Sequence, residues 1–141
     1  MACYSSFLNF ILAVAMTYEE FNKYCGALPG TSYVMQWGGS HVWKVGGKVF
    51  AIGSWNSEKY SGITFKVSEI GFEILRDEPG LRPAPYMASR GLKWIQHYAK
   101  PGLSDVDLQE HLLLSYQIVA SGLSGKKRRE LGIELEQDTE S

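Results

Sequence analysis

Apolar residues recur along this chain with two different periods, and each change of period separates a predicted helix from a predicted strand. Helical spacing predicts three helices, over residues 17–28, 68–76 and 104–123. Thr17 and Glu20 have capping-box spacing at the start of the first helix. A Ser-Gly pair at 124–125 is expected to close the last helix.

Alternation with a period of two predicts five strands, over residues 33–37, 41–45, 48–52, 63–67 and 92–98. The Gly46-Gly47 pair suits a two-residue hairpin turn, because glycine adopts positive φ at little cost. This turn would place Val45 opposite Lys48, Trp43 opposite Phe50 and His41 opposite Ile52. Trp43 and Phe50 are then expected to form a cross-strand pair facing the core, with Lys44 on the opposite face.

The order of these elements predicts an α+β domain, with an antiparallel sheet of hairpins and helices packed largely on one face. Residues 78–91 contain three prolines and two glycines, and they are expected to form a loop that is partly extended. We expect a single domain over residues 16–132, followed by an acidic tail at 133–141. Residues 1–15 are expected to be an N-terminal extension or a misassigned start; alternatively they pack on the domain or a partner, or form a secretion signal.

Charge is distributed unevenly along the chain. The formal net charge is -1, which argues against nucleic-acid binding by bulk charge. Residues 40–102 nevertheless contain nine Lys and Arg against five Asp and Glu, whereas residues 103–141 contain four against eight. The middle of the chain is therefore basic and its end is acidic.

Residues that would carry catalysis or bind metal show no recognisable pattern. Cys3 and Cys25 match no disulfide or zinc spacing, so a reducing, cytoplasmic compartment is expected. The apolar run near the N-terminus is too short to span a bilayer, so no membrane association is expected. His41, His97 and His111 have no metal-ligand spacing, and we expect neither a cofactor nor enzymatic activity.

An ordered set of local motifs resembles the MmcQ/YjbR family over roughly residues 17 to 132. The motifs are LPG at 28–30, KVGGKVFA at 44–51, TFKV at 64–67, PG-x-RPAPYM at 79–87, KWI at 93–95, SYQIVASGL at 115–123 and KKRREL at 126–131. The resemblance implies a fold similar to that of the bacterial frataxin CyaY. It also implies DNA binding through a double-wing motif, although a fold-level likeness does not establish function.

Cations and one tyrosine are the candidate nucleic-acid-binding residues, because phosphate contacts supply most of the affinity for nucleic acid. The candidates are Lys44, Lys48, Lys66, Arg82, Tyr86, Arg90, Lys93, Lys126 and Lys127. The lysines of the sheet would alternatively protect its edges from aggregation. Tyr86 would alternatively close over the sheet, and the cluster at 126–129 would be a solvated helix end.

Two functions of different classes therefore remain open. The first is a DNA-binding module that uses the basic sheet surface and the proline-rich loop, with affinity that falls steeply with salt. The second is a protein-interaction module that uses exposed aromatic residues and the RPAPY loop. The chain is expected to be a monomer or a weak homodimer.

Overall fold

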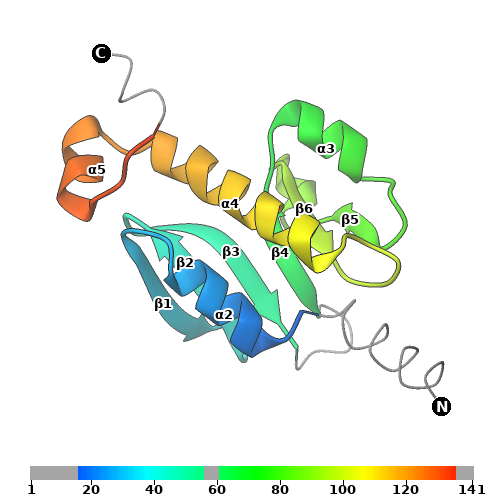
Figure 1. The fold of residues 1–141 in the computed structure, drawn as a ribbon. Coiled ribbons are helices and arrows are strands. Elements are labelled where there is room, and N and C mark those ends of the chain that lie inside the picture. Colours follow the sequence, from blue (N-terminus) through cyan, green and yellow to red (C-terminus); the bar gives the residue numbers. More distant parts are fainter. Residues whose placement is uncertain (1–15, 56–60, 136–141) are drawn as a thin grey trace.

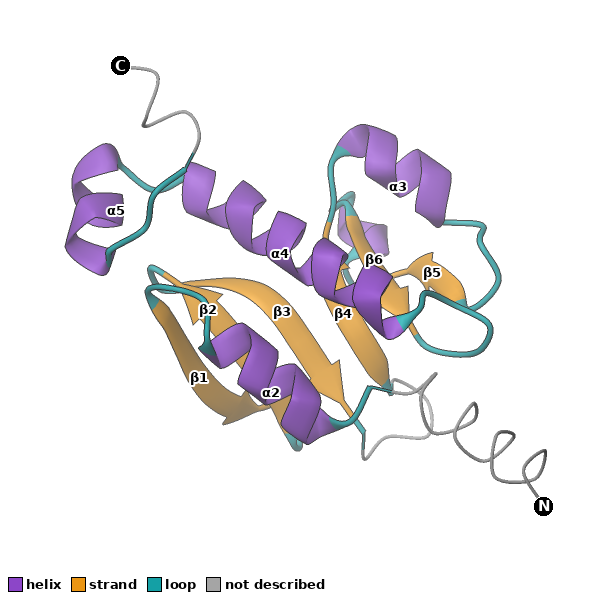
Figure 2. Ribbon diagram, viewed as in Figure 1, coloured by secondary structure: helices purple, strands orange, loops and turns teal. Residues whose placement is uncertain are grey.

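The computed structural model describes residues 16–55 and 61–135, which form one antiparallel sheet and a set of helices (Figure 1, Figure 2). The strands are β1 (Thr31–Gln36), β2 (Ser40–Val45), β3 (Lys48–Ser54), β4 (Gly62–Lys66), β5 (Leu81–Pro83) and β6 (Trp94–His97). The helices are α2 (Tyr18–Gly26), α3 (Glu69–Leu75), α4 (Asp105–Ser121) and α5 (Gly125–Leu131), with a 3-10 turn η1 (Ala88–Arg90). Our expectations for residues 1–15, for the loop at 56–60 and for the tail beyond 135 fall outside the described residues.

The six strands lie in the order β1-β2-β3-β4-β6-β5, and every neighbouring pair is antiparallel. Helices α2 and α4 pack on one face of this sheet, with α4 crossing β3 and β4 (Figure 1). The α+β class and the placement of the helices on one face are therefore confirmed. No helix in the described ranges is long and apolar enough to cross a membrane.

Short side chains begin the α-helices at the positions where the sequence predicts them. Thr17, Ser68 and Ser104 each accept a hydrogen bond from the backbone N–H three residues later. Such caps satisfy N–H groups that have no partner within the helix, and each contributes about 1 kcal/mol. Ser124 caps α5 in the same way, so the Ser-Gly pair begins a new helix after α4 has ended at Ser121.

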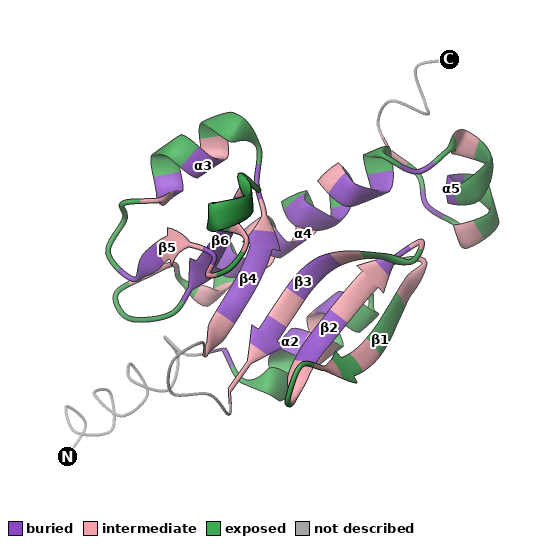
Figure 3. Ribbon diagram, turned by 180° about the vertical axis from the view of Figure 1, so that it is seen from behind, coloured by how far each residue is buried: buried purple, intermediate pink, exposed green. Residues whose placement is uncertain are grey.

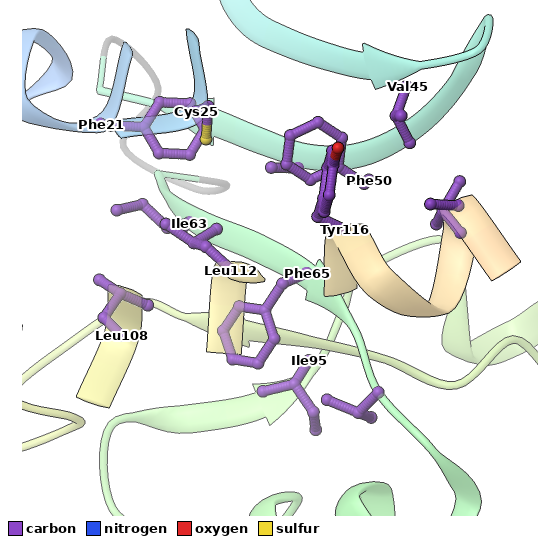
Figure 4. Packing of buried hydrophobic residues seen from close by; sticks show 14 of the residues in the cluster. Phe21, Cys25, Val45, Phe50, Ile63, Phe65, Ile95, Leu108, Leu112 and Tyr116 are labelled. Carbon is purple, nitrogen blue, oxygen red and sulfur yellow. The ribbon is translucent and has the colours of Figure 1, made fainter. Parts of the chain in front are cut away.

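The core lies between α2, α4 and the inner face of the sheet (Figure 4). Phe21, Phe65, Leu108 and Leu112 are buried completely or almost completely, and Cys25 is a buried free thiol as expected. Burial of each large apolar side chain stabilises the fold by about 1.5–3 kcal/mol. The core continues past the predicted domain end, because Ile133 is also buried within it.

The predicted register of the hairpin is correct at its tip and wrong beyond it. Val45 pairs with Lys48 as expected, but Trp43 pairs with Ala51 and His41 pairs with Gly53. The register shifts at a bulge between Trp43 and Lys44, which leaves Phe50 without a partner on either neighbouring strand. The Phe50 ring packs edge-on against Tyr116 of α4 at 5.5 Å between centroids, so the expected Trp43–Phe50 pair does not form.

Candidate functional site on the open face of the sheet

The face of the sheet opposite α2 and α4 carries alternate residues of each strand in cross-strand rows. The strand registers define a central row of Val34, Val42, Ile52, Thr64, Gln96 and Arg82. Towards the hairpin tip, Lys44 and Lys66 lie on this same face, on either side of β3. In the other direction, Ser40 and Ser54 share a hydrogen bond of 2.6 Å between their hydroxyl oxygens.

The proline-rich segment 84–91 folds back over this face, and Figure 3 shows η1 in front of the sheet. Ala84 N–H donates to the carbonyl of Trp94, which fastens the start of the segment to β6. The hydroxyl of Ser89 donates to the carbonyl of Tyr86, and Leu92 N–H donates to the carbonyl of Met87. These bonds hold the loop in one shape over the central row.

A groove of about 440 Å³ lies between this segment and the turn after β1. This volume falls within the range of small-molecule sites, about 300–1,000 Å³. The groove is lined mainly by apolar atoms, from Trp37, Ser40, Ile52, Ser54, Thr64, Pro85, Tyr86, Met87, Arg90 and Gln96. It combines two aromatic side chains with a small number of polar groups.

The two aromatic residues of the groove share an unusual backbone conformation. Trp37 has φ of 50° and Tyr86 has φ of 69°, and they are the non-glycine residues with positive φ in the described part of the chain. Each such conformation costs about 1–3 kcal/mol, and residues that adopt it cluster at functional sites. Both side chains also remain exposed, Trp37 by 65% and Tyr86 by 70%.

Charge is segregated between the strands of the sheet and the helices α2, α3 and α4. No strand of the sheet contains an aspartate or a glutamate, and neither does segment 84–91. Helices α2, α3 and α4 contain one cation, Lys23, against seven carboxylates, those of Glu19, Glu20, Glu69, Glu73, Asp105, Asp107 and Glu110. The open face therefore carries cations without carboxylates from the strands or from segment 84–91, although the whole chain is slightly acidic.

The structure brings five of the nine predicted residues to the open face, namely Lys44, Lys66, Arg82, Tyr86 and Arg90. Arg82 is already engaged, because its Nε donates to Gln96 Oε1 at 2.8 Å and its guanidinium lies 4.3 Å from the Tyr98 ring centroid. Arg90 is exposed at the rim of the groove.

The other four predicted cations lie elsewhere. Lys48 is at the hairpin tip, as expected. The Lys93 ammonium lies 4.6 Å from the centroid of the Phe72 ring of α3, on the helical side of the sheet. Lys126 and Lys127 lie on α5, beyond the end of α4 (Figure 1).

Trp37, like Thr64 and Gln96, lines the groove but is not among the predicted site residues. It precedes Gly38 and Gly39, and all three residues have positive φ in the turn between β1 and β2. The Trp-Gly-Gly sequence predicts a turn, and a tryptophan at an exposed turn is the signal that would have identified this residue.

The histidines lie outside the groove. His41 Nδ1 accepts a hydrogen bond from the Tyr33 hydroxyl at 2.9 Å, and the Asn22 amide nitrogen lies 3.2 Å away. Because Asn22 Oδ1 accepts from Trp43 Nε1, this amide nitrogen is the donor and His41 carries its proton on Nε2. Among the described residues, no three His, Cys, Asp or Glu side chains are grouped so that they could hold a metal ion.

Comparison with known proteins identifies relatives by family and by fold. The family model described as YjbR matches residues 26–118. A solved structure, that of Deinococcus radiodurans protein DR2400 with its domain described as DUF419, is similar with a TM-score of 0.72. The match covers 85% of this chain and 92% of that chain at 22% sequence identity, so it supports the fold alone. No curated protein matches this chain.

Proposed function

Since this chain belongs to the YjbR family, and since its sheet presents one basic face without carboxylates, we propose that it binds nucleic acid on that face. The proposed role is binding, without a catalytic step. The segregation of charge is the observation that carries the proposal, because four cations face one side while the acidic helices face the other. A polyanion would be attracted to the sheet and repelled by α2, α3 and α4.

Lys44 and Lys66 are suited to positioning the phosphate backbone. They lie on β2 and β4, so two strand spacings, about 10 Å, separate their backbones. Both are partly exposed, and neither forms an ion pair with a described residue. Phosphate contacts of this kind supply affinity that is independent of base sequence.

The proposal is tested by fluorescence anisotropy with short single-stranded and duplex DNA, titrated with salt. The double variant Lys44→Ala/Lys66→Ala is expected to bind weakly, with a log–log salt slope reduced by about 1.4 for a single strand. Lys126→Ala/Lys127→Ala changes the net charge equally but lies away from the open face, and it should bind like the wild type. Equal losses in the two variants, or no binding even at low salt, would reject the open face as a nucleic-acid site.

A second candidate function is the binding of a protein segment in the same groove. It is favoured by the mainly apolar lining and by the exposed rings of Trp37 and Tyr86. Such binding would depend weakly on salt, and a self-association would give a mass that rises with concentration. Sedimentation equilibrium over a range of protein and salt concentrations separates this candidate from nucleic-acid binding.

A further inference from the structure

We infer that the groove between Trp37 and Tyr86 holds one unpaired nucleobase, with the adjoining phosphate at Arg90. This inference rests on the proposed function and deepens it, because it identifies the ligand as single-stranded nucleic acid or a free nucleotide. A duplex would use the same basic face without placing a base in the groove.

The walls of the groove are suited to a planar aromatic ligand. Trp37 comes from the turn after β1 and Tyr86 from the proline-rich segment, so two parts of the chain that are distant in sequence each supply a ring. Aromatic side chains stack on bases regardless of base identity, since every base has a π-face. In a duplex the neighbouring pairs already cover those faces, so only an unpaired base can stack here.

The floor and rim supply the polar contacts that a nucleotide requires. Thr64 and Gln96 lie side by side in the central row, and Gln96 is oriented by the hydrogen bond from Arg82. Hydroxyl and amide groups at this place can recognise the hydrogen-bonding edge of a base. Arg90 at the rim forms no ion pair with a described residue and would meet the phosphate.

The backbone at both aromatic positions argues that the rings are kept for a ligand. A glycine would adopt the positive φ without strain, as Gly38 and Gly39 do beside Trp37. The Trp37 ring makes no ring or cation contact with any residue that the structure describes, and the residue is 65% exposed. Strain and exposure together are disadvantages in the free protein that stacking on a base would offset.

The same feature supplies variants that remove each ring. Trp37→Gly relieves the backbone strain, so its thermal midpoint is expected to equal or exceed that of the wild type. Tyr86→Gly relieves the same kind of strain but also removes the interactions of the Tyr86 side chain, so its thermal midpoint is measured to confirm that it folds. Tyr86→Phe retains the ring and serves as the matched control. Each protein is titrated with a short DNA single strand, the duplex of that sequence, and a strand of equal length that lacks its bases.

The wild type is expected to bind the single strand about tenfold more tightly than the strand without bases. The two glycine variants should lose that advantage but keep the wild-type affinity for the baseless strand, and Tyr86→Phe should keep both. Equal affinity of the wild type for all three DNAs, with no loss in the glycine variants, would overturn the base site and leave the basic face intact. No binding to any DNA would overturn the proposed function as well.

A free mononucleotide distinguishes the two sources of the base. If a mononucleotide perturbs the indole N–H resonance of Trp37 and competes with the strand, then the groove accepts free nucleotides. If only the strand perturbs that resonance, then the groove serves a polymer. Both results support a base site, whereas an unperturbed Trp37 resonance with bound single strand would reject it.

Discussion

Ser115 connects the longest helix to the bulge in the sheet. Its hydroxyl donates to the carbonyl of Phe50 at 2.6 Å and accepts from the N–H of Lys66 at 2.8 Å, and the residue is completely buried. The bulge removes Phe50 from the strand ladder, so this hydroxyl satisfies a carbonyl that would otherwise have no partner there. This one small side chain thus supplies the hydrogen bond that the bulge needs inside the core.

Replacing Ser115 with alanine is expected to lower the free energy of unfolding by about 2–4 kcal/mol, because a buried carbonyl and a partly buried N–H lose their partner. Urea denaturation of both proteins measures this difference. Ser121→Ala is the matched control on the same helix, since that residue is exposed, and it should change stability by less than about 0.5 kcal/mol. A Ser115→Ala protein as stable as the control would show that the bridge contributes nothing.

Two histidines, His97, which is buried, and His111, which is partly buried, set the expected pH dependence of stability. Burial lowers the pKa of His97 and that of His111, which stacks on Phe65, below the usual 6.5. The unfolded chain therefore binds protons at a higher pH than the native state does. The stability that these residues contribute is complete above pH 6.5 and is lost as the pH falls below it. Burial raises the pKa of Asp105, which acts in the opposite direction at lower pH.

We predict that the free energy of unfolding decreases between about pH 7.5 and pH 5.5, with a slope of up to about 1.4 kcal/mol per pH unit for each proton taken up. Urea denaturation at a series of pH values tests this. The variant His111→Gln removes one titrating group, so its slope should be shallower. A free energy of unfolding that stays constant or rises on acidification over this range would contradict the lowered pKa values of His97 and His111.

At the scale of elements, the Gly-Gly hairpin lies against Leu123, in the turn that follows α4. Gly46 has φ of 59°, and a Cβ atom there would lie 2.6 Å from Leu123 Cδ1. Gly47 has φ of 83°, and a Cβ atom there would meet nothing within 4 Å. A side chain at Gly46 would therefore meet both a steric clash and an unfavourable φ. A side chain at Gly47 would meet only the unfavourable φ.

This difference predicts unequal costs for the same substitution. Gly46→Ala is expected to lower the free energy of unfolding by about 2–4 kcal/mol, from backbone strain and the clash together. Gly47→Ala should cost about 1–2 kcal/mol from backbone strain alone. Denaturant unfolding of both variants measures these losses in the free energy of unfolding. Equal losses would mean that the hairpin tip does not contact Leu123 closely.

The starts of the helices could be predicted because they depend on local contacts. The bulge in the hairpin could not be predicted because it depends on tertiary contacts. The caps at Thr17, Ser68 and Ser104 depend on residues three positions apart, so the sequence predicts them correctly. The bulge depends on Phe50 reaching Tyr116 of α4, which strand periodicity does not reveal. Strand β6 is confirmed but shorter than predicted, since it begins at Trp94.

For the whole molecule, the sequence predicted the layers but not the groove. Alternation in the strands placed Lys44 and Lys66 correctly on the face away from the core. The groove needs the turn at Trp37 and the loop at Tyr86 to meet over one row of the sheet, and no periodicity reports which side of a sheet a loop covers. The uneven charge along the chain indicated a basic surface, whereas its separation from the acidic helices required the fold.

The way the C-terminal part closes the core bears on how the chain folds as it is synthesised. The Tyr116 hydroxyl donates to the carbonyl of Pro29, and Leu131 and Ile133 lie beside Gly30. All six strands leave the ribosome before α4 does, so the apolar face of the sheet stays exposed to solvent until α4 can pack on it. Such separated contacts slow folding, because the ends of a long loop must first meet. We therefore expect a chaperone to bind the nascent sheet until roughly the last turn of α5 has emerged.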